Sequence, residues 1–237
     1  MVIIGTNAAE LMNKKESFFR TIKTLSPSVF FVQETKARRK NKIKLNDYIT
    51  FEHVRKNKGA VHRNLAPVNI AANEDIEILV VEAQTGEART RFINAYGPQE
   101  ACKDATKQEF YNQLDIEIKK SKVAGSLICI EMDANAKLGS KVILNDPHPQ
   151  SKNGKLLENL IEDNDLVVVN GSALCEGLIN RKRVTVASTE ESILDYFIVC
   201  KEMFKRILRK EDRRRKKIFF NKVQYNKRKT KYKRKRS

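Results

Sequence analysis

Residues 126–139 read SLICIEMDANAKLG, an apolar run that passes directly into acidic and amide side chains. The apolar part is typical of a buried strand, and Asp133 and Asn135 stand two residues apart where that strand should end. Loops at strand ends hold side chains over one rim of a sheet, where groups remote in sequence can converge. This stretch therefore predicts a β-sheet with polar chemistry at its rim.

Outward from this stretch, the hydrophobic pattern alternates between short strands and longer helices. Helical spacing runs over about 13–25, 104–121 and 153–164. Runs rich in β-branched and aromatic residues predict strands at 2–7, 28–35, 48–54, 66–71, 76–83, 89–96, 126–133, 165–172, 183–188 and 192–200. This mixture predicts an α/β (α+β) fold built on antiparallel or mixed sheets.

Basic charge is concentrated in the last part of the chain. The net charge is +18, and residues 201–237 hold 19 Lys and Arg against 3 Asp and Glu, which leaves residues 1–200 nearly neutral. We expect a folded domain over 1–200 and a basic tail over 201–237, helical at first and then disordered. Clustered basic side chains bind nucleic acid through its phosphates, and the strongest candidates here are Arg213, Arg214, Arg215, Lys216 and Lys217. The alternative is a solvated tail with no binding role.

The four cysteines stand far apart without a CxxC pair, and two of them lie inside apolar runs. Reduced thiols in such places act as small hydrophobes, which favours a reducing compartment. No apolar run approaches the length of a membrane span. We therefore expect an intracellular monomer, nuclear or cytoplasmic, with no membrane partner and no small-molecule cofactor.

Polar side chains of similar chemistry follow several of the predicted strands. Asn7, Glu34 and Tyr96 lie at or near three strand ends, as Asp133 and Asn135 do in the first stretch. Carboxylate and amide oxygens are hard ligands that suit Mg²⁺, so the set favours a phosphate-handling metal site. The alternative is structural, because turns favour Asp and Asn, and a Tyr before a Gly-Pro turn is often a core residue.

Seven motifs favour the first interpretation over the second. In chain order they are NAAEL (7–11), PSVFFVQETK (27–36), INAYGPQE (93–100), MDANAKLG (132–139), NGKLL (153–157), NLIEDNDLVVVNGS (159–172) and SILDYFIV (192–199). Together they resemble the endonuclease/exonuclease/phosphatase superfamily, especially the endonuclease domains of non-LTR retrotransposons, over about residues 3–200. The resemblance implies a four-layer sandwich of two face-to-face mixed β-sheets flanked by helices, which cleaves phosphodiester bonds of DNA with Mg²⁺ or Mn²⁺.

The resemblance also implies a role for each residue of the predicted site. Glu34 matches the family's metal-binding glutamate, and Asn7 is its direct or indirect partner. Asp133 positions or deprotonates the attacking water, and Asn135 holds that water or the scissile phosphate. Tyr96 matches the tyrosine that donates a hydrogen bond to the phosphate.

The chain departs from the family pattern in several places. Asp195 matches an aspartate that orients a catalytic histidine, but no histidine follows it in the sequence. The three histidines, His53, His62 and His148, all lie upstream, and His148 in NDPHPQ is expected to be an exposed loop residue. The family's glycine-rich strand before the tyrosine is reduced here to KNKGAVHRNLAPV (56–68).

The chain departs from the family pattern at two more places. Glu131 and Met132 replace the residues that usually precede the motif's aspartate, and the basic tail stands where the family has its final strand. The domain therefore resembles a C-terminally truncated or degenerate member. We expect a Mg²⁺-dependent endonuclease impaired by loss of the histidine; the alternative is a catalytically inactive remnant that binds nucleic acid through its tail. A phosphatase acting on a lipid or small phosphoester is a third class.

Overall fold

The structure is a computed structural model that describes residues 3–7, 15–33, 47–52, 58–62, 67–73, 76–143, 146, 148–170, 172, 181–184 and 189–211. Two sets of predicted residues, Glu34 and the run Arg213–Lys217, lie outside these ranges. Asn7 and His62 are described as backbone within their strands.

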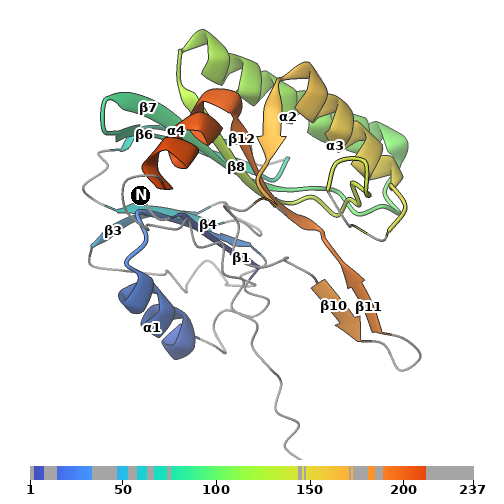
Figure 1. The fold of residues 1–237 in the computed structure, drawn as a ribbon, viewed down its shortest axis with the longest axis horizontal. Helices are drawn as coiled ribbons and strands as arrows, with labels where there is room; N and C mark the ends of the chain where they lie inside the picture. Colours follow the sequence, from blue (N-terminus) through green and yellow to red (C-terminus); the bar gives the residue numbers. More distant parts are fainter. Residues whose placement is uncertain are drawn as a thin grey trace, which may run out of the picture.

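The strands form two larger sheets and one hairpin (Figure 1). The four-stranded sheet has the order β1 (Ile3–Asn7), β2 (Val29–Gln33), β4 (Lys58–His62) and β3 (Tyr48–Glu52). The six-stranded sheet has the order β5 (Pro67–Asn73), β6 (Ile78–Thr85), β7 (Ala88–Tyr96), β8 (Leu127–Asp133), β12 (Asp195–Cys200) and β9 (Leu166–Val168). The hairpin pairs β10 (Arg181–Val184) with β11 (Thr189–Ser192) and projects away from the two sheets.

Strand direction decides which ends of the strands meet. In each large sheet one pair is parallel, β1 with β2 and β7 with β8, and the remaining pairs are antiparallel. Both sheets are therefore mixed, as predicted. The carboxyl ends of a parallel pair lie at the same edge, so the sequence positions that follow β7 and β8 come together.

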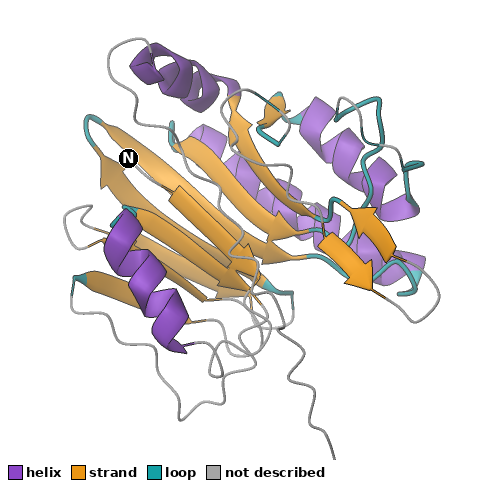
Figure 2. Ribbon diagram, turned by 60° about the horizontal axis from the view of Figure 1, so that its bottom comes forward, coloured by secondary structure: helices purple, strands orange, loops and turns teal. Residues whose placement is uncertain are grey.

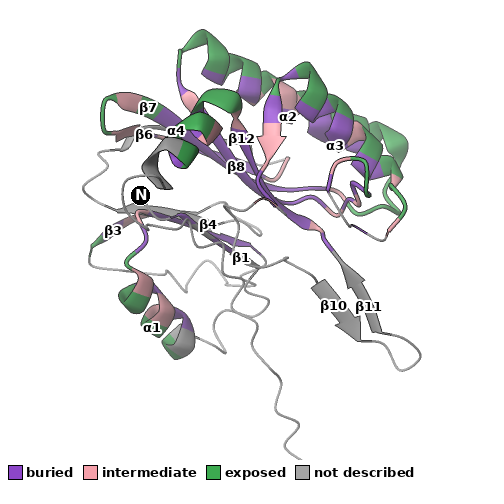
Figure 3. Ribbon diagram, viewed as in Figure 1, coloured by how far each residue is buried: buried purple, intermediate pink, exposed green. Residues whose placement is uncertain are grey.

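Helices cover the outer faces of both sheets (Figures 1 and 2). Helix α1 (Lys15–Leu25) packs Phe18 and Ile22 against the four-stranded sheet, where Phe30 and Val32 face them. Helices α2 (Asp104–Val123) and α3 (Lys152–Asp163) cover the six-stranded sheet with one buried face each and present their other faces to solvent (Figure 3). This is the amphipathic pattern that the sequence showed. No described helix is long and apolar enough to span a membrane.

The inner faces of the two sheets pack against one another. The rings of Phe31 on β2 and Phe92 on β7 have centroids 6.3 Å apart, and both side chains are buried. Helix α4 (Lys201–Glu211) adds Met203 and Ile207 to the same apolar cluster. A fully buried aromatic side chain contributes about 1.5–3 kcal/mol, so this inter-sheet core is a main source of stability.

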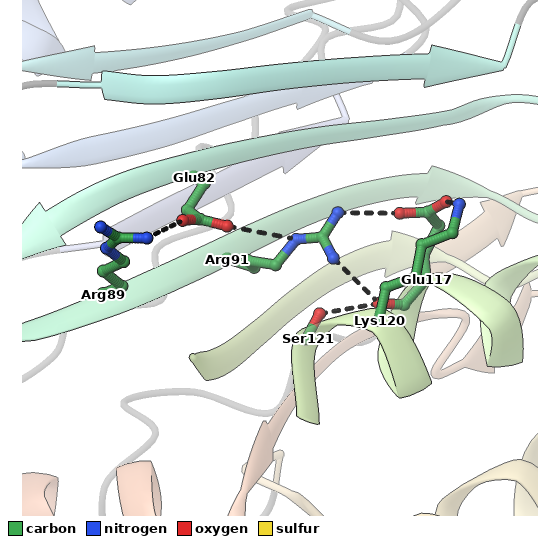
Figure 4. A network of polar contacts seen from close by, with 6 residues as sticks. All are labelled: Glu82, Arg89, Arg91, Glu117, Lys120 and Ser121. Atoms are coloured by element: carbon green, nitrogen blue, oxygen red, sulfur yellow. Dashed lines mark hydrogen bonds and ion pairs between the residues drawn. The ribbon is translucent and has the colours of Figure 1, made fainter. Parts of the chain in front are cut away.

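A charged network fixes α2 to the sheet near the beginning of β7 (Figure 4). The buried Arg91 lies between two carboxylates, with Nη2 2.9 Å from Glu117 Oε2 and Nε 3.8 Å from Glu82 Oε2. Lys120 also pairs with Glu117, at 2.7 Å, and the exposed Arg89 lies 3.8 Å from Glu82. A buried guanidinium needs such partners, because an unpaired buried charge is strongly destabilising.

The α/β class predicted from the sequence is confirmed, and two details differ. Residues 58–62 form a paired strand, β4, where the sequence suggested only the remnant of one. Residues 183 and 184 of the predicted strand 183–188 belong to β10, and residues 185–188 lie outside the described residues. Thr189–Ser192 forms a strand that was not predicted. Strands β4 and β11 are both short, and pairing with a neighbour stabilises them more than intrinsic propensity does.

Candidate active site

Three of the predicted site residues stand side by side across neighbouring strands. Tyr96, the last residue of β7, pairs in register with Asp133, the last residue of β8. Asp133 in turn pairs with Asp195, the first residue of β12, which runs antiparallel. Residues directly opposite one another have Cβ atoms about 4.5–5.5 Å apart and point to the same face. The structure therefore brings these three side chains to one rim of the six-stranded sheet.

Alternation along the strands shows that this face is the inner one. Phe92, Cys129 and Phe197 belong to the inter-sheet core, and Tyr96, Asp133 and Asp195 lie at even spacing from them along β7, β8 and β12. Asp133 has no exposed surface, and Asp195 is 5% exposed. The inner face thus changes from apolar to polar on approaching the rim.

Two residues further from the rim along β7 and β8, the inner face carries another pair of polar residues. Asn94 on β7 pairs in register with Glu131 on β8, and both side chains are buried. Glu131 is one of the residues that departs from the family motif. Its buried carboxylate lies two positions before Asp133 and therefore on the same face of the sheet.

The loop after β8 holds Asp133 and Asn135 in a tight turn. The Asn135 backbone N–H donates to Asp133 Oδ1 at 3.3 Å, and Asn135 has φ +46°, a left-handed conformation that asparagine tolerates well. Asn135 Nδ2 donates to Gly97 O at 2.9 Å, which ties this loop to the one after Tyr96. A Cβ at Gly97 would lie 2.5 Å from Ala134 O, so only glycine permits this close approach.

The N-terminus of α3 supports both rim loops. Asn153 Nδ2 donates to Pro98 O at 2.7 Å and to Asn135 O at 3.1 Å. The Glu100 carboxylate accepts the backbone N–H groups of Lys152 and Asn153 at 3.0 and 3.3 Å, where the helix dipole favours a negative charge. The motifs GPQE and NGKLL therefore form one frame behind the rim.

Gly154 and Ser151 complete that frame. Ser151 Oγ accepts the N–H of Gly154 as an N-cap and the N–H of Lys137 as a second bond, both at 3.1 Å. A Cβ at Gly154 would collide with Lys137 O. Helix α3 thus starts in direct contact with the loop that carries Asn135.

Two side chains hold the beginning of β12. Asn170 Nδ2 donates to Asp195 O at 3.0 Å, and Asn170 Oδ1 accepts from Phe197 N at 2.7 Å, so this amide continues the ladder between β9 and β12 as a peptide unit would. The Tyr196 hydroxyl is buried within hydrogen-bond distance of Ala136 O and Leu138 N. Burial raises the pKa of Tyr196, so its hydroxyl stays protonated.

The four-stranded sheet reaches this rim through Gln33. Asn7 and Gln33 are in-register neighbours at the ends of the parallel strands β1 and β2. Gln33 Nε2 donates to Asn94 Oδ1 at 3.1 Å and to Ala95 O at 2.8 Å, both on β7. Glu34 is the next residue in the chain, and its position is outside the described residues.

No family model and no curated protein matches the sequence. Solved structures do match it. The endonuclease domain of TRAS1, a telomere-specific non-LTR retrotransposon, aligns with a TM-score of 0.61 and 14% identity over 86% of both chains. The 3'-5' exonuclease NExo from Neisseria meningitidis aligns with a TM-score of 0.65 and 13% identity over 86% of this chain and 88% of its own. TDP2 of D. rerio, complexed with a single-strand DNA product, aligns with a TM-score of 0.59 and 13% identity over 84% of each chain.

The chain has the endonuclease/exonuclease/phosphatase fold. In this fold the predicted residues Tyr96, Asp133, Asn135 and Asp195 occupy neighbouring strand ends and one loop. His148 was expected to be an exposed loop residue, but it is half-buried in the loop before α3. Its Nδ1 lies 3.0 Å from Oδ1 of the buried Asp146.

The rim offers oxygen atoms that could act as metal ligands. Among the described residues, no group of three His, Cys, Asp or Glu is arranged to hold a metal ion. Mg²⁺ usually takes only one or two carboxylates and completes its shell with water and phosphate oxygens. Asp133, Asn135 and Tyr96 offer oxygen atoms of this kind, whereas Glu34 lies outside the described residues.

Several residues that shape the rim were not assigned a role from the sequence. They are Gln33, Glu131, Asn153 and Asn170, which all lie inside or beside the quoted motifs. Gln33, Asn153 and Asn170 each make a hydrogen bond to a strand or loop that is distant in sequence. The sequence signal that could have identified two of them is the alternation of side chains along β2 and β8, which places Gln33 and Glu131 on the inner face. Their partners become visible only when the two sheets are in place.

Proposed function

We propose that this chain hydrolyses phosphodiester bonds in DNA as a Mg²⁺-dependent endonuclease. The observation that supports this most is the in-register placement of Tyr96, Asp133 and Asp195 on the inner face at one rim. The structural neighbours add support, since one is described as an endonuclease domain and another as an exonuclease. The proposed substrate is DNA because another neighbour is described as complexed with single-strand DNA product.

In this proposal Asp133 accepts the proton of the attacking water. General-base catalysis of this kind typically contributes about 10²–10⁴ in rate. Asn135 donates one amide hydrogen to Gly97 O, which fixes the amide and leaves Oδ1 and the second N–H to orient the water or the phosphate. The Tyr96 hydroxyl donates to a non-bridging phosphate oxygen.

Glu34 would hold the Mg²⁺ ion, and Asn7, which is in register with Gln33 across β1 and β2, is its proposed partner. A bound divalent ion neutralises the charge that grows on the phosphate oxygens, which is worth several kcal/mol. Mn²⁺ has the same preference for oxygen ligands and should replace Mg²⁺.

Asp195 has no histidine after it in the sequence, so we propose a slow enzyme. Loss of one preorganised donor from a site of this kind lowers the rate by about 10²–10³. Nicking should therefore be detectable over long incubations and should depend on the divalent ion.

Nicking of supercoiled plasmid with Mg²⁺ tests this function. Asp133→Asn removes the base with little change in shape and should lower the rate at least about 100-fold. Asp163→Asn is the matched control, because Asp163 is an exposed carboxylate at the end of α3 remote from the rim. Equal cleavage by the unaltered chain and Asp133→Asn would overturn the proposal.

The second candidate is a catalytically inactive module that binds nucleic acid through Arg213, Arg214, Arg215, Lys216 and Lys217. The positive charge of the tail motivates this candidate, since residues 201–237 include 19 basic and 3 acidic residues. A truncation that tests it should end after Glu211, because α4 contributes Met203 and Ile207 to the inter-sheet core. Loss of salt-sensitive DNA binding on truncation would support this candidate, and unchanged binding would refute it.

A further inference from the structure

The first turn of α3 carries an asparagine that is buried between the two rim loops. Asn153 has no exposed surface. Its Nδ2 donates to Pro98 O at 2.7 Å, in the loop after β7, and to Asn135 O at 3.1 Å, in the loop after β8. One side-chain amide therefore joins a helix and two loops that are separated in the sequence.

Neither helix formation nor hydrogen-bond satisfaction explains an asparagine at this position. Asparagine is a weak helix former, and Ser151 already supplies the N-cap of α3. Asn153 Oδ1 is buried and has no hydrogen-bond partner among the described residues, and such an acceptor is destabilising. An aspartate would suit the first turn of a helix better, because the helix dipole favours a negative charge there. The two donated hydrogen bonds are what distinguishes the amide.

Asn135, one of the two acceptors, has a backbone conformation that needs support. Its φ of +46° is left-handed, a conformation that costs free energy in a residue other than glycine. In this conformation its backbone N–H donates to Asp133 Oδ1, and its Nδ2 donates to Gly97 O. Asn153 binds the third polar group of the same residue, its carbonyl oxygen. A change in the Asn135 backbone would therefore move all three groups together.

The second acceptor connects the same amide to the loop that follows Tyr96. Pro98 lies two residues after Tyr96. Gly97, between them, donates its N–H to Asp133 O at 2.7 Å and accepts from Asn135 Nδ2 at 2.9 Å. The amide from α3 thus closes a set of hydrogen bonds that includes two residues of the proposed reaction and adjoins the third.

We propose that Asn153 is a positioning residue that fixes Asn135 relative to Tyr96 and Asp133. This inference rests on the proposed function above. It requires a donor at this position, since neither alanine nor a carboxylate can donate to Pro98 O and Asn135 O. Asn153 is buried, so it acts through the two loops and not through contact with the substrate.

Nuclear magnetic resonance of the full chain, isotope-labelled at its asparagines, tests the proposal without DNA or turnover. The side-chain amide signals of Asn135 are identified by their loss in Asn135→Ala. One of these hydrogens is bonded to Gly97 O, so its signal should differ from that of a solvated amide. In Asn153→Ala and Asn153→Asp this signal should shift toward that of a solvated amide, because the Asn135 carbonyl is no longer held.

Asn164→Ala is the matched control, because Asn164 is a buried amide at the other end of α3. Its Nδ2 also donates twice, to Asp115 Oδ1 at 2.7 Å and to Leu160 O at 3.1 Å, but these bonds lie between α2 and α3. Thermal unfolding should show a similar loss of stability in Asn164→Ala and Asn153→Ala. Only the latter should shift the Asn135 signals. Equal shifts in both variants, or no shift in Asn153→Ala, overturn the role of Asn153.

Circular dichroism reports whether each variant stays folded. Asn153→Ser, which keeps one donor on a shorter side chain, replaces Asn153→Ala and Asn153→Asp if both unfold. It should shift the Asn135 signals in the same direction, because its hydroxyl cannot bind both acceptors, and unchanged signals would overturn the proposal.

Plasmid nicking connects the position of Asn135 to the reaction. Asn153→Ala should nick at least about tenfold more slowly than the unaltered chain, because misplacing a reacting group by about 1 Å can lower the rate about 100-fold. Asn164→Ala should nick at the rate of the unaltered chain. Unchanged nicking in Asn153→Ala overturns the positioning role. An unaltered chain that does not nick DNA refutes the endonuclease, and the Asn135 signals still decide whether Asn153 positions that residue.

Discussion

Replacing Tyr196 by phenylalanine should loosen the loop that carries Asn135 while leaving the aromatic ring in the core. The hydroxyl lies 3.0 Å from Ala136 O, 2.9 Å from Ile193 O and 3.3 Å from Leu138 N. Tyr196 has no exposed surface, so water cannot replace the hydroxyl once it is removed. The change leaves a buried donor and two buried carbonyl groups with fewer partners.

The size of the effect follows from those contacts. Leaving a buried polar group unsatisfied destabilises by about 1–3 kcal/mol, and the carbonyls keep part of their hydrogen bonding through the backbone, so we expect a loss of about 2 kcal/mol. For a chain of this length each kcal/mol lowers the melting temperature by about 2–4 °C. The variant should therefore melt about 4–8 °C below the unaltered chain.

Tyr111 provides a matched control inside the same core. It is 3% exposed, and its hydroxyl has no hydrogen-bond partner among the described residues. Tyr111→Phe removes an unsatisfied polar atom and should leave the melting temperature unchanged or raise it slightly. Both variants keep an aromatic ring, so the comparison isolates the hydrogen bonds.

Thermal unfolding followed by circular dichroism measures both variants, and plasmid nicking adds a functional readout. Tyr196→Phe should also nick more slowly, because Ala136 and Leu138 lie one and three residues after Asn135 in the same loop. A melting temperature for Tyr196→Phe within about 1 °C of the unaltered chain, or an equal loss in Tyr111→Phe, would refute the reasoning.

Three further changes test other contacts. Gly154→Ala should separate α3 from the rim loop, because the added Cβ collides with Lys137 O. This variant should have a lower melting temperature and a lower nicking rate. Gly125 is exposed and has open space around it, so Gly125→Asn should change neither quantity. Arg91→Met should destabilise by about 3 kcal/mol in urea unfolding, because it removes the buried cation that Glu82 and Glu117 share and leaves them only the exposed Arg89 and Lys120. A neutral result would contradict the role of the network. Hydrogen bonds from Lys141, Lys155 and Gln150 lower the pKa of Glu158 from 4.5 to about 2. The contribution of Glu158 to the free energy of unfolding is therefore complete above pH 4.5 and is lost as the pH falls toward 2. Glu158→Gln should make stability fall less steeply between pH 4.5 and 2, and an unchanged fall would contradict this role.

The sequence allowed the rim to be predicted because its residues lie at strand ends in recognisable motifs. Asp133 and Tyr96 end clear apolar runs, so the alternation and the motif order were sufficient for them. Asp195 was expected inside a strand over 192–200, but it is the first residue of β12. The contacts that hold these residues could not be predicted in the same way. Asn153 and Asn170 bind backbone atoms of loops and strands that are far away in sequence, and such partners depend on sheet order.

Two elements show why charge and propensity misled the sequence analysis. Residues 58–62 include a glycine and a lysine and were interpreted as a remnant, but they form a strand between β2 and β3 because both neighbours offer backbone hydrogen bonds. The beginning of the basic tail was expected to be helical, and its charge concealed the apolar pair Met203 and Ile207. These residues lie four apart and pack into the inter-sheet core.

The position of β12 has a consequence for how the chain folds as it is synthesised. It is the last strand of the described chain, yet in the sheet it lies between β8 and β9, and it carries one side of the rim. Until residues 195–200 have emerged from the ribosome, β8 and β9 have no partner between them and present open backbone edges to other molecules. Such late, long-range closure slows folding and favours aggregation of incomplete chains, so the nascent protein should depend on chaperones until β12 has inserted.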